Sequence, residues 1–569
     1  MRAERTLKNR ISTSLIAAVS SIALATTAMP AVAQTATQTV TSAATSTPVA
    51  TPAETTTATP AAKETTTPSA TPTPTSTPAP AAMNGPMDVV LGIGKTQKEA
   101  NLNWLTAKDV KDQVVQFAPA KGITAENIAA KGTEIKATST VVNVAEGLTK
   151  DEVKKKDATN STDYGRHIAT LTGLKANTEY VYRVGSAANG WSELETFKTG
   201  DFDKTWNFLF LGDPQLGSGG HSVPESQEMW INNLKKIQEK AGDFSFIQSA
   251  GDQLQLGNKG EHDALTAADQ LQSYRFAPIN GNHDNYDFEA FRGFYNRPNM
   301  QADERNYFYE YNNMLMITLD TNHIDDIDAD AAFVDETIKA HGKGKDWIVV
   351  TFHHAPYSQA NHQDDKDIQV LREKLNPKLS EMGVDLVLSG HDHIYTRSHL
   401  MQGNDPVIPE KKPAVGDVYK PNKGEVMYLT ANSATGTKFY DFFKDDVDYE
   451  GMTREEAEKK GLVQPYTAYW DQQYTPNYTN IKVSGGALKV STFDIESGEL
   501  VDEFTLEKEN KSGLGSSEGS AVSSSEGPLT AILAVLGAIG GLGWALATGQ
   551  LHIPGVDVKA ELAKLGIRI

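Results

Sequence analysis

The sequence predicts an antiparallel β-sandwich followed by a layered α/β domain, on the evidence of three observations. Short runs with period-two hydrophobicity, separated by frequent turns, fill residues 85–200. After residue 201, apolar strands alternate with amphipathic helical stretches. Residues 34–84 and 509–527 hold few large apolar side chains, so they cannot bury a core. We therefore expect two folded domains, 85–200 and 201–508.

The composition excludes several classes of protein. The chain has 569 residues, no cysteine and a formal net charge of −20. Without cysteine there is no disulfide scaffold, thiolate zinc site or catalytic thiol. Any metal ion must be held by histidine, carboxylate or amide side chains. The acidic balance also argues against a protein that binds the nucleic-acid backbone, which requires a clustered basic face.

The N-terminus has the pattern of an export signal. Basic residues precede an apolar run over 11–28, and small residues end at Ala33. We expect residues 1–33 to be a signal peptide cleaved before Gln34; the alternative is a membrane-spanning helix that stays attached. Residues 34–84, rich in Thr, Pro and Ala, are expected to form a disordered spacer whose composition would suit O-glycosylation.

The C-terminal region predicts a membrane anchor. A Ser/Gly linker over 509–527 leads to an uncharged apolar run over 528–548, about the length that crosses a bilayer, and then to a short tail over 549–569. A buried or self-associating soluble helix is the alternative. Together with the export signal, this pattern predicts a protein exposed at the cell surface.

The first domain shows strand patterns such as 140–144. The segment 170–184 resembles the leucine, turn and tyrosine segment of a fibronectin type III domain. Trp104 and Tyr180 are most simply core residues of this sandwich, and a ligand-binding role is the alternative.

The second domain places polar residues after its predicted strands. Apolar strands are predicted at 208–211, 244–247, 347–350 and 386–388, and helices at 225–240 and 364–381. Active residues of α/β folds collect in loops at strand ends. Five such ends, in chain order, are Gly212-Asp213-Pro214-Gln215, Gly251-Asp252-Gln253, Gly281-Asn282-His283-Asp284, Phe352-His353-His354 and Gly390-His391-Asp392-His393.

This ordered set resembles the calcineurin-like metallophosphoesterases and, with the preceding sandwich, most resembles the purple acid phosphatase branch. The resemblance implies a binuclear metal site with Asp252 as the shared carboxylate. Asp213, Gln215 and His393 would belong to one metal site. Asn282, His353 and His391 would hold the other metal. The implied cofactors are two divalent ions, zinc, manganese or iron.

Two positions depart from the family pattern. The purple enzymes have a tyrosine three residues after the bridging aspartate, where this chain has Gln255. The wider superfamily has a histidine two residues after the first aspartate, where this chain has Gln215. An amide oxygen suits a hard divalent ion better than ferric iron, so we expect a colourless enzyme.

Five further residues are expected near the substrate. In the implied two-metal chemistry a metal-bound hydroxide attacks phosphorus, and His283 is expected to protonate the leaving alcohol, with Asp284 orienting it. The resemblance places His362 on the substrate side. His354 is expected beside the metal ligands or near substrate. Arg397 is expected to contact phosphate, with a surface salt bridge as the alternative.

These features favour a surface-anchored phosphatase acting on small phosphate monoesters. A phosphodiesterase acting on nucleotides or cell-envelope diesters is an alternative within the same chemistry, because both reactions use the same phosphoryl site. A surface adhesion protein with a vestigial metal site is the alternative of a different class. Oligomeric state, natural substrate and pH optimum are not specified by the sequence.

Overall fold

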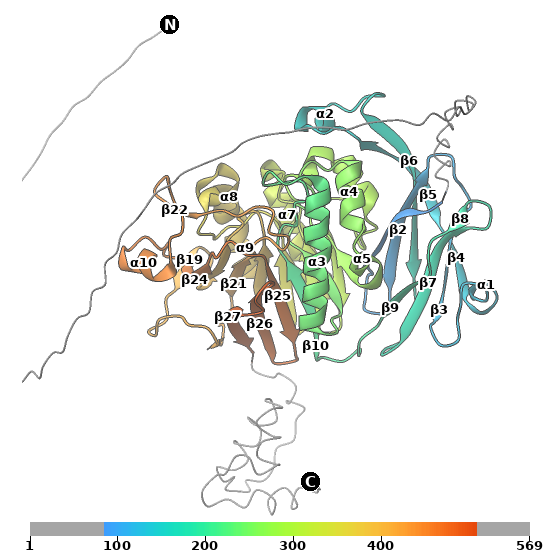
Figure 1. Cartoon of the computed structure of the whole chain (residues 1–569). Coiled ribbons are helices and arrows are strands. Elements are labelled where there is room, and N and C mark those ends of the chain that lie inside the picture. Colours follow the sequence, from blue (N-terminus) through green and yellow to red (C-terminus); the bar gives the residue numbers. More distant parts are fainter. Residues whose placement is uncertain (1–84, 509–569) are drawn as a thin grey trace, which may run out of the picture. The chain divides into compact units, whose positions relative to one another are not determined.

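The structure is a computed structural model that describes residues 85–508 (Figure 1). The predicted signal peptide, spacer, linker, anchor and tail all lie outside these residues. Within the described part of the chain, no helix is both long enough and apolar enough to cross a membrane.

The N-terminal region forms two facing β-sheets. Their shared core is built from alternate side chains of both sheets, which is why the period-two pattern is clear in the sequence. One sheet contains β1 (Met87–Ile93), β2 (Ala100–Ala107), β5 (Thr138–Ala145) and β6 (Ser161–Leu171). The other contains β3 (Val114–Pro119), β4 (Thr133–Lys136), β7 (Glu179–Ser186), β8 (Gly190–Trp191) and β9 (Glu195–Lys198); the short helices are α1 (Ile128–Lys131) and α2 (Lys150–Lys154).

Trp104 and Tyr180 belong to this core, as their sequence context predicts. Trp104 is fully buried and its indole N–H donates to Gln113 Oε1 at 3.2 Å. The Tyr180 hydroxyl accepts the backbone N–H of Lys175 at 2.9 Å, so it ties the turn before β7 to the sheet. Neither side chain is left open to a ligand.

The second region is a sandwich of two mixed sheets. The first sheet contains β10 (Trp206–Leu211), β11 (Phe246–Ser249), β12 (Arg275–Ala277), β20 (Asp417–Tyr419), β25 (Asn477–Val483), β26 (Ala487–Asp494) and β27 (Leu500–Glu507). The second contains β13 (Tyr307–Tyr311), β14 (Met314–Thr318), β15 (Trp347–Thr351), β16 (Leu386–Ser389), β17 (Tyr395–Ser398), β18 (Leu400–Gln402), β19 (Asp405–Val407), β21 (Glu425–Thr430) and β24 (Thr467–Asp471). A separate hairpin pairs β22 (Phe442–Lys444) with β23 (Val447–Tyr449).

Helices cover the outer faces of both sheets. The first sheet is covered by α3 (Val223–Ala241), α4 (Lys259–Thr266), α5 (Gln270–Ser273) and α6 (Phe288–Phe294). The second is covered by α7 (Ile327–His341), α8 (Lys366–Val370), a π-helical turn (Leu371–Leu375) and α9 (Asn376–Met382), while α10 (Arg454–Lys459) lies beyond β23 in sequence. Three 3-10 turns precede helices at Asp284–Asp287, Ile324–Asp326 and Asn361–Asp364.

Strand β10 shows why its sequence is apolar throughout. Phe208 and Phe210 face the core between the two sheets, whereas Leu209 and Leu211 face α3. Alternate side chains of β10 therefore point to two buried faces, instead of one buried face and one face exposed to solvent. The helix expected over 225–240 is α3, which begins with a capping box between Ser222 and Glu225 and ends at Gly242.

The two regions share one sheet, which the division at residue 200 does not suggest. Gly92 of β1 pairs with Phe276 of β12 in parallel, so the sandwich strands extend the first sheet to eleven strands. Side chains reinforce this junction: Tyr182 Oη donates to the carbonyl of Gln272 at 2.8 Å, and Arg166 Nη2 donates to that of Tyr295 at 2.9 Å. The two regions are therefore joined by both backbone pairing and side-chain hydrogen bonds.

Candidate metal centre

The predicted polar strand ends meet at one edge of the two sheets. Strands β10, β11 and β12 are mutually parallel, as are β15, β16 and β21. Parallel strands bring their carboxyl ends to the same edge, so the loops that follow them lie together. Asp213, Asp252, His353, His391 and His393 are all buried there.

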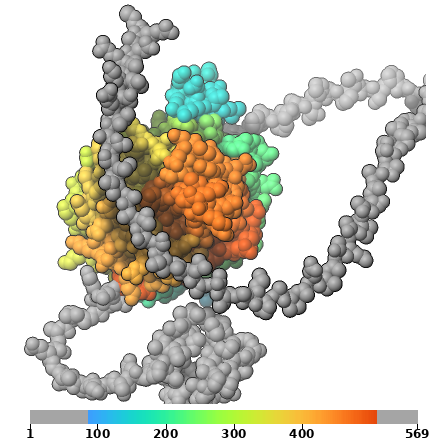
Figure 2. Space-filling model, turned by 90° about the vertical axis from the view of Figure 1, so that its left-hand side faces the viewer, coloured from blue at the N-terminus to red at the C-terminus, as the bar shows by residue number. Residues whose placement is uncertain are grey.

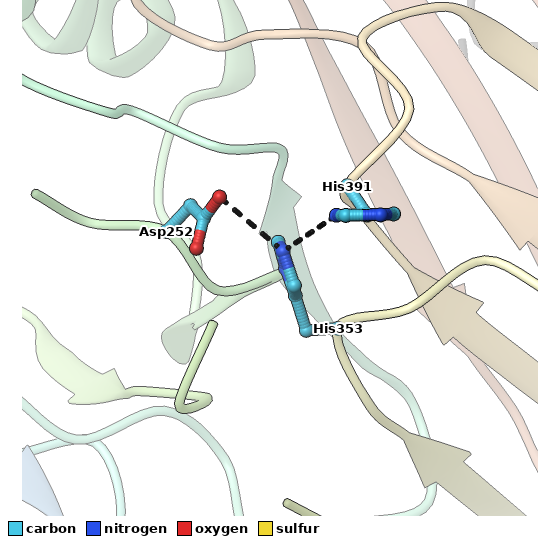
Figure 3. A group of neighbouring side chains, drawn as sticks. All are labelled: Asp252, His353 and His391. Carbon is cyan, nitrogen blue, oxygen red and sulfur yellow. Dashed lines mark hydrogen bonds and ion pairs between the residues drawn. The ribbon is translucent and has the colours of Figure 1, made fainter. Parts of the chain in front are cut away.

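Four potential ligand atoms, one of them from His353 itself, lie close together; Figure 3 shows the residues of three of them, Asp252, His353 and His391. His353 Nε2 lies 3.0 Å from Asn282 Oδ1, 3.2 Å from His391 Nδ1 and 3.3 Å from Asp252 Oδ2. His391 Nδ1 is itself 3.0 Å from Asn282 Oδ1. Imidazole nitrogens, a carboxylate and an amide oxygen at such separations have the donor chemistry of a divalent metal site.

Asp213 and His393 form a second pair of potential ligands. His393 Nε2 is 3.4 Å from Asp213 Oδ2, and the backbone N–H of His391 donates to the same oxygen at 2.6 Å. Asp213 Oδ1 has no hydrogen-bond partner among residues 85–508, although it is buried. A buried carboxylate oxygen without a donor is an acceptor that a cation would satisfy.

Gln215 provides a second buried acceptor of this kind. Its Nε2 donates to Gln255 Oε1 at 3.0 Å, and its own Oε1 has no partner in the described part of the chain. The side chain is fully buried. The residues present therefore fit a cation site, because two buried oxygens, on Asp213 and Gln215, lack any protein donor.

Hydrogen bonds from outside the cluster fix the imidazole rings. His353 Nδ1 bonds to the carbonyl of Ala250 at 2.9 Å, and His393 Nδ1 bonds to that of Lys438 at 2.8 Å. Each carbonyl holds a proton on Nδ1, so Nε2 faces the aspartates. Burial acts to lower the pKa of His353, but Asp252 and Asp213 raise it to about 10, so without a bound cation its Nε2 also carries a proton. His391 instead turns Nδ1 into the cluster.

The loops reach this arrangement through unusual backbone conformations. Gln215, Asp252 and His391 have φ angles of 39°, 42° and 68°, a region that residues other than glycine rarely adopt. Strained backbone of this kind is concentrated at functional sites. A Cβ added at Gly281 would lie 2.0 Å from Asp252 Oδ1, so only glycine permits this close approach.

The pKa values of the cluster reflect the proximity of two buried carboxylates, those of Asp213 and Asp252. Burial and the charge of Asp252 raise the pKa of Asp213 to about 7. Burial also acts to raise the pKa of Asp252, but His353 and His283 outweigh it and hold that pKa below its usual range. Burial lowers the pKa of His393 to about 3, with Lys438 adding to the effect, so its ring is neutral. A neutral ring can bind a cation.

His283 lies at the edge of the cluster. Its backbone N–H donates to Asp252 Oδ1 at 2.9 Å, and its Nδ1 bonds to the carbonyl of Gln255 at 2.8 Å. Burial lowers the pKa of His283, while Asp252 opposes that change. The Gln255 carbonyl therefore orients the ring and leaves Nε2 available.

The expected partnership between Asp284 and His283 needs correction. The Asp284 carboxylate accepts backbone N–H groups of Gln253 and Leu254 at 3.2 Å and of Gly281 at 3.0 Å. It therefore ties the loop after β11 to the loop after β12. Its role is to position the loops that carry the potential ligands, because its oxygens are taken by the backbone.

The rings of the remaining predicted histidines both lie beside that of His391. The ring of His362 is 4.2 Å from that of His391 between centroids, is half-buried, and bonds to Asp365 Oδ2 through Nδ1 at 2.7 Å. Its Nε2 lies 3.3 Å from the Tyr440 hydroxyl. His354 is buried, with Nδ1 bonded to Thr321 Oγ1 at 2.8 Å and Nε2 at 3.7 Å from Asp367 Oδ2. His362 is the more accessible of the two, and the expectation that His354 contacts substrate is corrected, because its ring is buried.

Arg397 is not part of the site. Its side chain is fully buried between the sheets, where Nε and Nη2 lie 2.7 and 3.2 Å from the carboxylate oxygens of Asp502. Its Nη1 donates to the hydroxyl of Tyr419 at 2.6 Å. Neither the expected phosphate contact nor the alternative of a surface salt bridge is correct. The sequence could not show that Arg397 lies on an inward-facing position of β17.

The structure adds Lys438 and Tyr440 to the predicted set. Lys438 is half-buried and its Nζ lies 4.6 Å from the centroid of the Tyr440 ring. That ring is 5.1 Å from His393 and 5.3 Å from His362. Burial lowers the pKa of Lys438, and Asp252 and Asp213 oppose the change. The sequence signal that could have located Lys438 is the polar loop after the apolar run 425–430, because that run is the buried strand β21.

Sequence comparisons identify two family matches. Residues 86–199 match the family described as purple acid phosphatase, N-terminal domain, and residues 207–395 match calcineurin-like phosphoesterase. Two uncharacterized proteins of Mycobacterium tuberculosis, from strains CDC 1551 and H37Rv, are each 24% identical over 327 residues. These alignments cover 49% of this chain and 60% of each relative, so the chain spans less than two thirds of their length.

Two plant proteins are also similar. Purple acid phosphatase 17 of Arabidopsis thaliana is 35% identical over 95 residues, which are 17% of this chain and 26% of the plant protein. The structure of a purple acid phosphatase from yellow lupin (Lupinus luteus) seeds superposes with a TM-score of 0.56 and 16% identity, and covers 78% of both chains. At this identity the superposition shows a shared fold.

Proposed function

The chain belongs to the calcineurin-like phosphoesterases and carries the N-terminal domain of the purple acid phosphatases, and from this we propose that it hydrolyses small phosphate monoesters with two divalent metal ions. The observation that carries the proposal is the convergence of Asp252, Asn282, His353 and His391 beside the unsatisfied oxygens of Asp213 and Gln215. This donor set contains nitrogen and oxygen only, which suits zinc, manganese or ferrous iron.

In the proposed assignment, two groups of residues hold the ions. Asp213, Gln215 and His393 would hold one, and Asn282, His353 and His391 the other, with Asp252 shared. The bound ions would supply Lewis-acid stabilisation of the phosphoryl oxygens and an activated water. The neutral rings and amides limit the negative charge of the site, which favours the approach of a phosphate dianion.

The residues around the ions would complete the reaction. Because the Gln255 carbonyl holds the Nδ1 proton of His283, only the doubly protonated ring has a proton on Nε2. We assign that form, which the charge of Asp252 favours, to protonate the departing alcohol. Lys438 and His362 both contact Tyr440, and the ammonium group of Lys438 would attract the phosphate group.

The direct test is metal analysis of the purified full chain together with initial rates on an aryl phosphate and its bis-aryl diester. We expect two equivalents of metal and faster turnover of the monoester. Asp252→Asn should lose metal and most activity, whereas Asp269→Asn, at an exposed aspartate that makes no cap hydrogen bond, should lose neither. Faster diester turnover would assign a phosphodiesterase instead, and a metal-free inactive protein would favour the adhesion alternative.

We also infer that the protein acts outside the cytoplasm, attached to a membrane. The support is the sequence pattern of residues 1–33 and the uncharged run over 528–548. Fractionation of cells that express the full chain should place it in the membrane fraction. A chain truncated after residue 527 should appear in the medium, and its retention in the membrane fraction would overturn the anchor.

A further inference from the structure

One segment of the N-terminal sandwich reaches the loops of the metal centre. The connection between β5 and β6, residues 146–160, leaves the sandwich and carries α2; we call it the β5–β6 arm. Figures 1 and 2 show α2 lying out from the sandwich, as part of a projection on the surface. Asn258 Nδ2 donates to the carbonyl of Gly147 at 3.0 Å, and Lys156 Nζ pairs with Asp287 Oδ1 at 2.8 Å.

This anchoring is firm because Asp287 is itself buried. The lysine that pairs with it, Lys156, also donates to the carbonyl of Asn143 at 2.8 Å, and the N–H of Ala145 donates to Asp287 Oδ2 at 3.3 Å. Asp287 ends the turn that begins immediately after His283. The arm is thus fixed to the segment that carries His283.

Two lysines of the arm meet at Tyr286. Lys150 Nζ donates to the Tyr286 hydroxyl at 2.9 Å and lies 4.2 Å from its ring centroid. Lys154 Nζ lies 4.9 Å from the same centroid. Both lysines are exposed, and neither has a carboxylate partner among residues 85–508. Two ammonium groups without a carboxylate partner among residues 85–508 therefore meet on one tyrosine, on a helix that also carries the exposed Asp151 and Glu152.

The two ammonium groups lie next to the predicted position of the leaving group. The ring of Tyr286 is 5.2 Å from that of His283 between centroids. His283 Nδ1 is held by Gln255, so its free nitrogen is the one assigned to the departing alcohol. The ring of Tyr286 therefore lies between His283, which is assigned to protonate the leaving alcohol, and the two ammonium groups. A leaving group long enough to extend past this ring would contact the lysines.

We propose that Lys150 and Lys154 form a second anion subsite, which binds a phosphoryl group carried by the leaving group of the substrate. The favoured substrates are then molecules whose two phosphoryl groups are separated by a spacer, such as a sugar bisphosphate. This inference rests on the proposed phosphatase function. Lysine is suited to the task because its ammonium group donates to phosphate oxygens from several directions.

The test compares substrates with one and two phosphoryl groups on the metal-loaded full chain. We expect Lys150→Ala/Lys154→Ala to lower kcat/KM for a sugar bisphosphate at least about tenfold more than for an aryl phosphate, chiefly through KM, whereas a nucleoside diphosphate, whose phosphoryl groups are adjacent, should behave like the aryl phosphate. High salt should shrink this difference, because the lysines are exposed. A variant with arginine in place of both lysines should keep most of the preference for the sugar bisphosphate.

Lys155→Ala is the matched control. Lys155 is exposed in the same segment and makes no contact with Tyr286, so its loss should leave the substrate preference unchanged. Equal losses for all substrates in the double variant would show that the lysines only support Tyr286. The same change of preference in Lys155→Ala would show a general effect of charge. Either result overturns the subsite.

A binding measurement separates this inference from the proposed function. Calorimetry with an alkane-1,6-bisphosphonate and a simple alkylphosphonate needs no turnover, because neither compound is hydrolysed. The subsite predicts that the bisphosphonate binds more tightly than the alkylphosphonate to the unmodified chain, and that the difference is lost in the double variant. If no phosphate ester is hydrolysed, the proposed function fails while this measurement still decides the subsite. A preference for the bisphosphonate that survives in the double variant overturns it.

Discussion

The side-chain amide of Gln215 donates to that of Gln255 across 3.0 Å, which joins the two positions that depart from the family pattern. The Gln255 carbonyl in turn holds His283 at 2.8 Å. The two glutamines therefore connect a predicted metal ligand to the residue assigned as proton donor. Neither glutamine carries a phenolate or an imidazole.

Gln255 predicts the colour of the enzyme. The unmodified chain should remain colourless with any divalent ion, because no phenolate occupies this position. Gln255→Tyr loaded with ferric iron should gain a charge-transfer band in the visible spectrum. Gln255→Phe, which has the ring without the hydroxyl, should stay colourless. A strong visible band in the unmodified metal-loaded protein would contradict this prediction.

Replacement of His283 should separate catalysis from metal binding. His283→Ala should lower turnover about 10²–10⁴-fold, the usual contribution of a positioned general acid, with metal content retained. Metal analysis and initial rates on the same preparation provide the measurement. His323→Ala, at an exposed histidine, should change neither. Parallel losses of metal and turnover would instead give His283 a structural role.

Lys438 should contribute to phosphate affinity. Lys438→Ala should weaken competitive inhibition by inorganic phosphate about tenfold, a change of about 1.4 kcal/mol, because a half-buried positive charge is lost near the aspartates. Lys438→Arg should keep most of the affinity. Lys423→Ala, at an exposed lysine, serves as the control. An unchanged inhibition constant in Lys438→Ala would exclude the contact.

Arg397 should matter for stability rather than for phosphate binding. Arg397→Ala leaves the Asp502 carboxylate buried without its partner, so the free energy of unfolding should fall by about 3–5 kcal/mol in urea denaturation. Arg292→Ala removes an exposed pair with Glu304 and should cost less than about 1 kcal/mol. Activity per folded molecule should persist in both variants. A stable Arg397→Ala protein with weakened phosphate binding would reverse our correction.

His262 should make the fold sensitive to acid. It is buried, stacks on Phe294 with ring centroids 3.5 Å apart, and neither ring nitrogen has a partner among residues 85–508. Burial lowers the pKa of His262 to about 3. Because the unfolded chain takes up this proton near pH 6.5 and the folded chain does not, His262 reduces stability progressively between about pH 6.5 and 3.

His262→Phe removes this proton uptake and keeps an aromatic ring on Phe294. The free energy of unfolding of this variant should fall less steeply on acidification through that interval than that of the unmodified chain. Urea denaturation at a series of pH values gives the comparison, with His323→Phe, at an exposed position, as the control. Equal slopes in His262→Phe and the unmodified chain would assign the acid sensitivity elsewhere.

Local patterns were sufficient to locate most of the cluster. Asp213, Asp252, His353 and His391 each follow a predicted apolar strand, and such strand ends can be recognised from hydrophobicity alone, whereas Asn282 follows the short strand β12, which contains Arg275. Lys438 has the same relation to β21 but lies in a loop of small polar residues, without a histidine or aspartate to mark it. Its place near the aspartates depends on how β21 pairs with β16.

Three assignments could not be made from the sequence because they depend on partners far along the chain. The carboxylate of Asp284 is taken by backbone groups of the loop after β11, about thirty residues away. Asp502 lies 105 residues from Arg397, and that pairing decides that the arginine is buried. His354 differs from its neighbour His353 only in the direction of the side chain, which the fold sets.

The sequence by itself determined which residue types end each strand, and with them the donor chemistry of the site, because strand periodicity and ligand preference are local properties. Tertiary structure alone decided which ring nitrogen faces the cluster, since that depends on carbonyls such as those of Ala250 and Lys438. It also decided that Lys150 meets Tyr286 across 136 residues. Such contacts arise only when the sandwich and the second region share one sheet and dock.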